Sequence, residues 1–202
     1  MNEADPRVKR TRKLLQQALI SLLAEKSFHA ISVQDITERA TLNRATFYAH
    51  FEDKFALMDY LVRETFREEV EKRVGNSATF TVRRLPLLVV TVCEFMGSFH
   101  GHCAPPTNDL NAPIEAKVQD ELYAYILDWL HHDQWADMPP ESVAAIMSWA
   151  IFGAGMQWSR GDRATSAKDL ARQVVTVLLT GVAQHASPHA NPETKEQKVA
   201  QQ

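Results

Sequence analysis

Apolar residues recur at helical spacing along almost the whole chain, whereas the alternation expected of strands is weak. Within residues 6–25 four leucines form one such stripe: Leu15, Leu19, Leu22 and Leu23. Stripes of the same period predict further helices over residues 54–72, 85–99, 113–129, 141–159 and 165–182. The composition of residues 99–113 predicts a loop between two of them. The pattern therefore predicts an all-α protein.

Two short helices are predicted between the first two long ones. Ser32 and Asp35 have the spacing of a capping box that opens the first of them. Asn43 can cap the second, which runs to about residue 50, and Asp53 can cap the long helix that follows. A short helix, a tight turn and a second short helix resting on a longer one are typical of units that place a helix in the major groove of DNA.

The charge is distributed unevenly along the chain. The net charge is −3, but residues 1–50 hold eight basic and five acidic residues, and residues 51–202 hold fourteen basic and twenty acidic ones. A head of charge +3 on a body of charge −6 indicates that the head meets a polyanion, although a solvated helix face would show the same excess.

Composition excludes several classes of protein. Hydrophobic residues make up 45% of the chain and charged residues 23%, which is typical of globular proteins. No apolar run approaches the length of a bilayer span, and the first residues lack the apolar stretch of a secretory signal. Two cysteines, Cys93 and Cys103, are too few for a disulfide framework. These features predict a cytoplasmic protein.

The stretch from residue 11 to residue 58 resembles the TetR family of bacterial transcriptional regulators. The motifs that carry the resemblance are SVQDITERA at residues 32–40 and TFYAHFEDK at residues 46–54. One departure lies in the turn, where family members usually have Ala-Gly-Val-Ser and this chain has Ala-Thr-Leu-Asn. Thr41 replaces the glycine, and a β-branched residue resists a positive φ.

The resemblance implies an N-terminal three-helix DNA-binding domain at residues 1–53 and a helical domain for effector binding and dimerisation at residues 54–186. The polar residues 187–202 are predicted to be a disordered tail. It also implies a ligand-responsive regulator that binds a palindromic operator as a homodimer, more often a repressor than an activator. A protein-interaction module that keeps the fold without an effector is the alternative, and no enzyme motif is apparent.

The DNA contacts implied by the resemblance lie on the predicted recognition helix and its flanks. Arg44 has the side chain to grip guanine O6 and N7, whereas Ala45 and Thr46 would meet thymine methyls or phosphates. Tyr48, His50 and Lys54 would contact phosphates. The complete expected set is Arg12, Gln34, Asn43, Arg44, Ala45, Thr46, Tyr48, His50 and Lys54.

Two functions are expected of the C-terminal helices. Residues 143–158 are apolar nearly all round, which predicts a dimer interface or, alternatively, a core helix of a monomer. The expected interface residues are Ile151, Gly155, Val174, Leu178 and Val182. The aromatic and methionine side chains Phe95, Met96, Phe99, Tyr123, Trp129 and Trp149 would line a pocket for an apolar or aromatic effector, although any core contains such residues.

Several potential metal ligands are grouped in the same half of the chain. They are His100, His102 and Cys103, with His131 and His132 further on. Their spacing matches no recognised zinc pattern, so neither a metal nor another cofactor is expected. A thiol sensor at Cys103 is a weaker hypothesis than metal binding.

Overall fold

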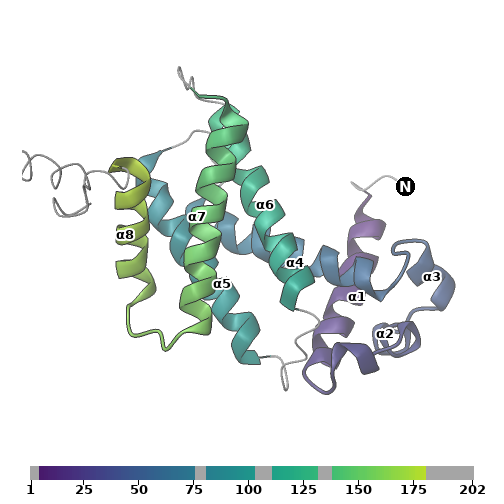
Figure 1. Ribbon diagram of the computed structural model, residues 1–202. Coiled ribbons are helices and arrows are strands. Elements are labelled where there is room, and N and C mark those ends of the chain that lie inside the picture. The colour runs from purple at the N-terminus through teal and green to yellow at the C-terminus, as the bar shows by residue number, and fades with distance from the viewer. Residues whose placement is uncertain (1–4, 76–80, 103–110, 132–137, 181–202) are drawn as a thin grey trace, which may run out of the picture.

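The computed structural model describes residues 5–75, 81–102, 111–131 and 138–180 (Figure 1). Within these ranges the chain forms helices and no strand, which confirms the predicted all-α fold. The α-helices are α1 Pro6–Leu23, α2 Val33–Ala40, α3 Arg44–Tyr48, α4 Lys54–Val74, α5 Leu85–His102, α6 Asn111–His131, α7 Pro140–Arg160 and α8 Ala167–Thr180. Two short 3-10 helices, Phe28–Ala30 and Val82–Arg84, precede α2 and α5.

Helices α1, α2 and α3 form a small head around one apolar cluster. Leu15, Leu19, Phe28, Ile36 and Phe47 are each at most 1% exposed and belong to this part of the core. Their burial fixes the angle between the two short helices, which have too few residues to be stable alone.

The predicted caps are present at the starts of α2, α3 and α4. The Ser32 hydroxyl accepts a hydrogen bond from the backbone N–H of Asp35 at 3.1 Å, and the Asp35 carboxylate accepts one from the Ser32 N–H at 2.7 Å. Asn43 accepts from the N–H of Thr46 at 2.7 Å, and Asp53 begins α4 in the same way. These caps satisfy N–H groups that a helix start leaves without partners.

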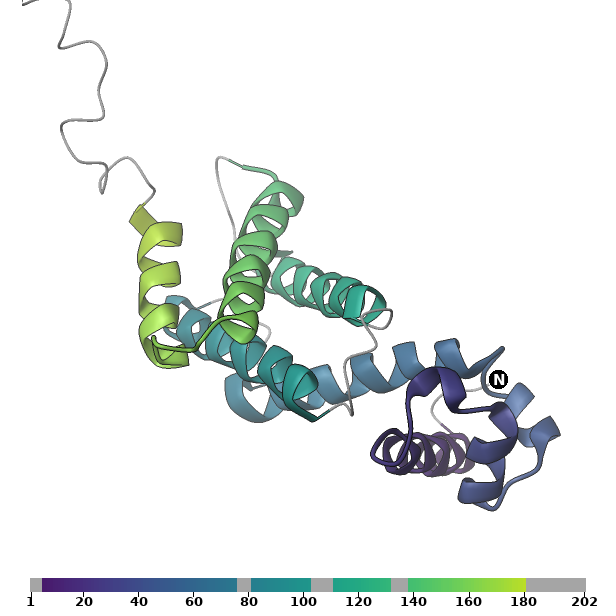
Figure 2. The ribbon, with the colours of Figure 1, turned by 60° about the horizontal axis from the view of Figure 1, so that its bottom comes forward.

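Helix α4 connects the head to the body, as Figure 2 shows. Its early residues Leu57 and Leu61 are buried, and it contacts α1. Further along, Phe66 and Val70 are buried, and the Phe66 ring meets the Phe95 ring of α5 edge to face at 5.1 Å. One helix therefore contributes to both packed regions.

The body is built from α5, α6, α7 and α8, with α5 and α6 both packed on α7. Gly155 lies where α7 approaches α5 most closely, since a Cβ atom there would be 2.7 Å from Val92 Cγ1. Ile151, on the same side of α7, is fully buried. This side of α7 therefore belongs to the protein's own core.

Three predicted helix boundaries, the end of α5 and the starts of α6 and α8, differ from the structure. Residues 99–113 were expected to be a loop, but α5 extends to His102 and α6 begins at Asn111, two residues before Pro113. Packing of α5 on α7 and α8 outweighs the low helix propensity of Gly and His, and proline is tolerated in a first turn. Helix α8 begins at Ala167, two residues after the predicted start at residue 165, and is capped by Ser166. The predicted tail at residues 187–202 and Val182 lie outside the described residues.

Among the helices in the described ranges, none combines the length and apolar character that crossing a membrane requires.

Candidate nucleic-acid interface

The short helix α3 presents polar side chains outward and is held by apolar ones inward. Phe47 is fully buried, whereas Arg44, Ala45 and Tyr48 are exposed. Asn43 binds Thr46 twice, because its side-chain oxygen accepts from both the N–H and the hydroxyl of Thr46. The start of α3 is thus rigid, and its first residue, Arg44, is free to extend toward a ligand.

The turn between α2 and α3 has the left-handed backbone conformation that a threonine in place of the family's glycine made doubtful. Thr41 adopts φ 56° and ψ 41°, the left-handed region that favours glycine. Two backbone hydrogen bonds close the turn, from Thr41 N–H to Glu38 and from Leu42 N–H to Thr37, at 3.1 and 2.9 Å. Their closure of the helix end holds a β-branched residue in an unfavourable conformation.

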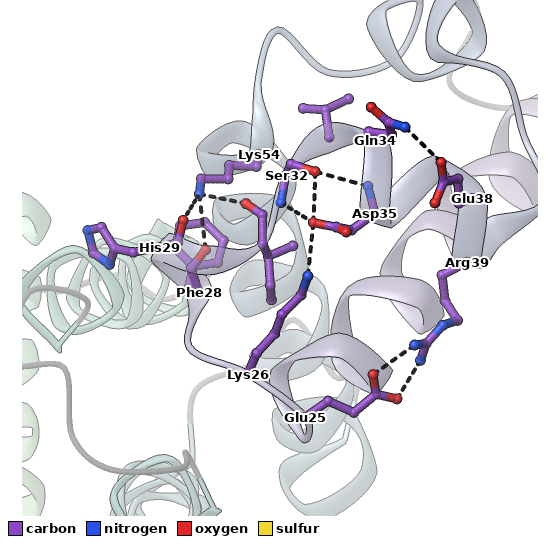
Figure 3. Close-up of polar contacts among 12 residues, drawn as sticks. Glu25, Lys26, Phe28, His29, Ser32, Gln34, Asp35, Glu38, Arg39 and Lys54 are labelled. Atoms are coloured by element: carbon purple, nitrogen blue, oxygen red, sulfur yellow. Dashed lines mark hydrogen bonds and ion pairs between the residues drawn. The ribbon is translucent and has the colours of Figure 1, made fainter.

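A salt bridge that the sequence did not reveal holds α2 against α1 (Figure 3). Both terminal nitrogens of the Arg39 guanidinium donate to the Glu25 carboxylate at 2.8 Å, and Arg39 also binds the Ser21 hydroxyl. The hydrogen bonds from Arg39 lower the pKa of the Glu25 carboxyl. Such a bidentate pair fixes orientation as well as distance. Arg39 therefore has a structural partner and was not among the expected DNA contacts.

The carboxylate of Asp35 serves two elements at once. Besides capping α2, it forms an ion pair with Lys26, whose Nζ atom lies 3.0 Å from Asp35 Oδ2. The hydrogen bonds from Ser32, and then Lys26, hold the pKa of Asp35 well below its usual range. On the next turn, Gln34 donates to Glu38 at 2.8 Å and remains exposed on the surface of α2.

Lys54 does not point toward solvent as a phosphate ligand would, which corrects the expectation from the resemblance. Its ammonium donates to the carbonyl oxygens of Phe28, His29 and Ile31 at 3.0, 3.1 and 2.7 Å (Figure 3). It also lies 4.8 Å from the centre of the Phe28 ring. An ammonium has three N–H donors, and here each has a carbonyl partner. Burial lowers the pKa of Lys54. The residue ties the first turn of α4 to the α1–α2 connection.

His50 and Arg12 lie close together at the edge of the head. The Nδ1 atom of His50 is buried and has no hydrogen-bond partner among the described residues. Burial, and then the charge of Arg12, lowers the pKa of His50. The Arg12 guanidinium lies 5.8 Å from the Phe51 ring centre and 5.0 Å from that of Tyr60. Whether either side chain meets a phosphate stays a prediction.

The structure corrects the expected dimer interface. Ile151 and Gly155 are buried in the chain's own core, and Val174 and Leu178 are partly buried against it. The opposite face of α7 is exposed and carries Ile146, Trp149, Ala150 and Gly153. Helical periodicity could reveal two apolar faces on this helix, but not which of them covers the core.

The expected effector residues are not gathered around one cavity. Phe95, Met96 and Trp129 are 5%, 1% and 1% exposed and belong to the packed core, against which Tyr123 is partly buried. Trp149 is 62% exposed on the outer face of α7. Phe99 lies in the last turn of α5, and its side chain is outside the described part of the structure.

A groove of about 420 Å³ runs instead between α4 and α6. The side chains that line it are Phe66, Arg67, Val70, Glu71, Glu121, Ala124, Tyr125 and Asp128. Arg67 of α4 bridges the groove to Glu121 of α6 at 2.7 Å. Because three carboxylates face one guanidinium, the lining is acidic. No signal in the sequence marked these residues, since they come together only when α4 and α6 pack.

Among the described side chains, no group of three or more His, Cys, Asp or Glu residues is placed to hold a metal ion. The side chains of His100, His102, Cys103 and His132 lie outside that description. The Nε2 atom of His131 lies 3.8 Å from Oε1 of Glu141.

An exposed, capped helix on a compact three-helix head is the architecture of a helix-turn-helix unit. Residues 15–61 match the family model described as bacterial regulatory proteins, tetR family. This stretch of the chain is therefore similar to the N-terminal domain of the TetR family.

Two relatives match a part of the chain. YxbF of Bacillus subtilis (strain 168), an uncharacterized HTH-type transcriptional regulator, is 39% identical over 70 residues, which are 34% of this chain and 18% of YxbF. DhaS of Lactococcus lactis (strain IL1403), the HTH-type dhaKLM operon transcriptional activator, is 33% identical over 58 residues, 29% of this chain and 31% of DhaS. The chain thus matches less than a third of the length of either relative.

Solved structures show that the fold extends over most of the chain. The dihydroxyacetone kinase operon activator DhaS aligns with a TM-score of 0.57 at 22% identity, covering 86% of this chain and 97% of that one. The fatty acid degradation regulator FadR from Bacillus halodurans aligns with a TM-score of 0.54 at 17% identity, covering 85% and 96%. At these identities the likeness establishes the fold alone.

Proposed function

We propose that this protein is a transcriptional regulator, not an enzyme, and that it binds a palindromic DNA operator in the cytoplasm as a homodimer. The observation that carries the proposal is the recognition helix α3, whose exposed Arg44 follows a cap that fixes its first turn. A guanidinium at that place can bind guanine O6 and N7 in the major groove. Arg12, Tyr48 and His50 are proposed phosphate contacts that set the register.

The exposed apolar face of α7 supports the dimer. Ile146 and Trp149 are 58% and 62% exposed, and a Cβ atom at Gly153 would meet nothing within 4 Å. Helix α8 adds Val177 and Leu179, 45% and 51% exposed. A two-fold dimer buries the same face on both copies and places the two recognition helices on one side of the dimer. Each recognition helix then meets one half-site of the operator, and half-sites one turn of DNA apart are separated by about 34–36 Å.

The groove between α4 and α6 is the proposed effector site, because α4 leads directly to the head. Its lining fits an aromatic ligand that also carries a positive charge, since the Phe66 and Tyr125 side chains lie beside Glu71 and Asp128. The effector expected from the sequence was apolar or aromatic, and the positive charge is the difference. A coupling of about 1–3 kcal/mol would change operator affinity about 5- to 150-fold.

Repression is the proposed sign of regulation, because a dimer lying across promoter DNA excludes polymerase sterically. DhaS is named as an activator, so transcription from a promoter into which a bound operator sequence has been placed, with and without the protein, decides between the two.

The experiment that tests the proposal is selection of binding sites from random duplex DNA with the full chain, followed by anisotropy titration. We expect enrichment of one two-fold symmetric sequence and binding of one dimer per duplex. Failure to enrich any sequence, with the protein folded and dimeric, would overturn the proposal in favour of a protein-interaction module.

A further inference from the structure

A second groove, of about 650 Å³, lies between α1 and α4 where the head meets α4. It is lined by Lys9, Arg12, Lys13, Gln16, Tyr60, Arg63, Glu64, Arg67 and Glu68. Five basic side chains face two acidic ones, which leaves a net charge of +3. The rest of the chain after residue 50 is acidic, so this concentration of positive charge is local. Its volume is typical of small-molecule sites.

The helical registers explain why these charges converge. Lys9, Arg12 and Lys13 are spaced three and four residues apart and lie on one face of α1. Arg63 and Arg67 are related in the same way on α4. Packing of α1 on α4 then brings the two cationic faces to opposite walls of one groove.

The guanidinium groups in the groove are positioned rather than loose. Arg12 and Arg63 lie against the same ring, 5.0 and 5.4 Å from the centre of Tyr60. The Nε atom of Arg63 is buried and makes no hydrogen bond among the described residues, although a Glu64 carboxylate oxygen lies 3.8 Å from it. At the far end, Arg67 gives its Nε–H to Glu121 at 2.7 Å, and a guanidinium has four further N–H donors. Guanidinium groups bind phosphate oxygens in pairs of parallel hydrogen bonds.

We propose that this groove binds a compact anion with two or more phosphate groups, which bridges α1 to α4. Such a ligand would neutralise the excess charge and give the Arg63 donor a partner. It would also fix the head against α4, the helix that links it to the body. The proposal does not depend on operator binding.

A small ligand fits the groove better than the phosphate backbone of an operator. Arg67 is thirteen residues beyond the start of α4, about 20 Å along the helix axis. At that point it already bonds to Glu121 in the body. DNA lying against α3 would have to reach along α4 to the body to fill the same groove.

The test is calorimetric titration of the full chain with inorganic pyrophosphate, without DNA or divalent cations and at constant ionic strength. We expect saturable binding that sulfate does not reproduce at the same concentration. Lys13→Gln and Arg63→Gln should each raise the Kd about tenfold, as expected for the loss of one charged hydrogen bond. Lys72→Gln is the matched control, since Lys72 is an exposed lysine of α4 outside the groove. Lys13 is exposed, so its variant tests the site even if Arg63→Gln fails to fold.

Two results would overturn the proposal. One is an absence of saturable binding, or binding that Lys13→Gln weakens no more than Lys72→Gln. The other is competition between pyrophosphate and the selected operator for the protein, combined with a lower slope of log K against log salt for operator binding by Arg63→Gln. A reduction of that slope by about one unit per half-site would make the groove a DNA surface. The calorimetry contains no DNA, so failure of the proposed function would leave its outcome unchanged.

Discussion

Lys54 offers the sharpest test of how the head is assembled. Lys54→Met keeps an unbranched side chain of similar length over the Phe28 ring and removes the ammonium that donates to three carbonyl oxygens. The head would lose its link between the first turn of α4 and the α1–α2 connection. A phosphate ligand and a structural link predict different consequences of this one substitution.

The expected loss of stability follows from the contacts. A hydrogen bond to a charged group contributes about 1.5–3 kcal/mol, and a cation over an aromatic ring about 0.5–1 kcal/mol at an exposed site. The Lys54 side chain is only partly buried and the freed carbonyls can bind water, so the combined loss should be about 2 kcal/mol. For a chain of this size, that lowers Tm by about 4–8 °C, measured at fixed protein concentration.

Operator binding distinguishes the two roles of Lys54. A phosphate contact removed from each half-site would reduce the slope of log K against log salt by about 2 per dimer. For a structural link we expect weaker binding with an unchanged slope, because the contacts with DNA remain the same in number. Lys72→Met makes the same chemical change on an exposed turn of α4 and should alter neither stability nor slope. A slope that falls in Lys54→Met without a loss of Tm would refute the structural role.

Four further predictions follow from single residues. Arg44→Ala should cost about 1–3 kcal/mol of discrimination at one base pair per half-site; equal loss on every base variant would contradict base reading. Trp149→Arg should give a monomer by light scattering, whereas Ile20→Arg, an exposed apolar position on α1, should stay dimeric. Thr41→Gly should raise the free energy of unfolding by about 0.5–1 kcal/mol, since relief of the left-handed strain exceeds the added entropy of the unfolded chain; an unchanged urea midpoint would show that the turn is unstrained. The pKa of His50 is lowered in the folded state, so its neutral form contributes stability above about pH 6.5 that is lost as the pH falls. Between pH 7 and pH 5 the wild type should therefore lose more free energy of unfolding than His50→Gln. Parallel pH profiles of the two proteins would exclude this linkage.

Much of the head could be predicted from the sequence, because its signals act between near neighbours. Ser32 with Asp35, and Asn43 with Thr46, interact across three residues, so the chain specifies these helix starts without its tertiary structure. The doubt about Thr41 was local in the same sense. A helix end that needs a left-handed residue imposes that conformation even on threonine.

The role of Lys54 depended on the tertiary structure. Its partners lie 23 to 26 positions earlier in the chain, and no spacing rule connects them. The sequence motif places Lys54 at a helix start, and that position is compatible with both a phosphate contact and a structural link. The packing of α4 on the head decides between them.

The faces of α7 show the same division between sequence and tertiary structure. The sequence shows the apolar positions of α7, but they form two faces. Periodicity does not show which of the two faces packs on the core. The side with Gly155 packs on α5, where the missing side chain leaves room for Val92, and Trp149 lies on the opposite side. The sequence determined the helices, and the starts of α2, α3 and α4, through periodicity and local capping. Only the tertiary structure decided which faces meet, because that choice depends on contacts between residues far apart in the chain.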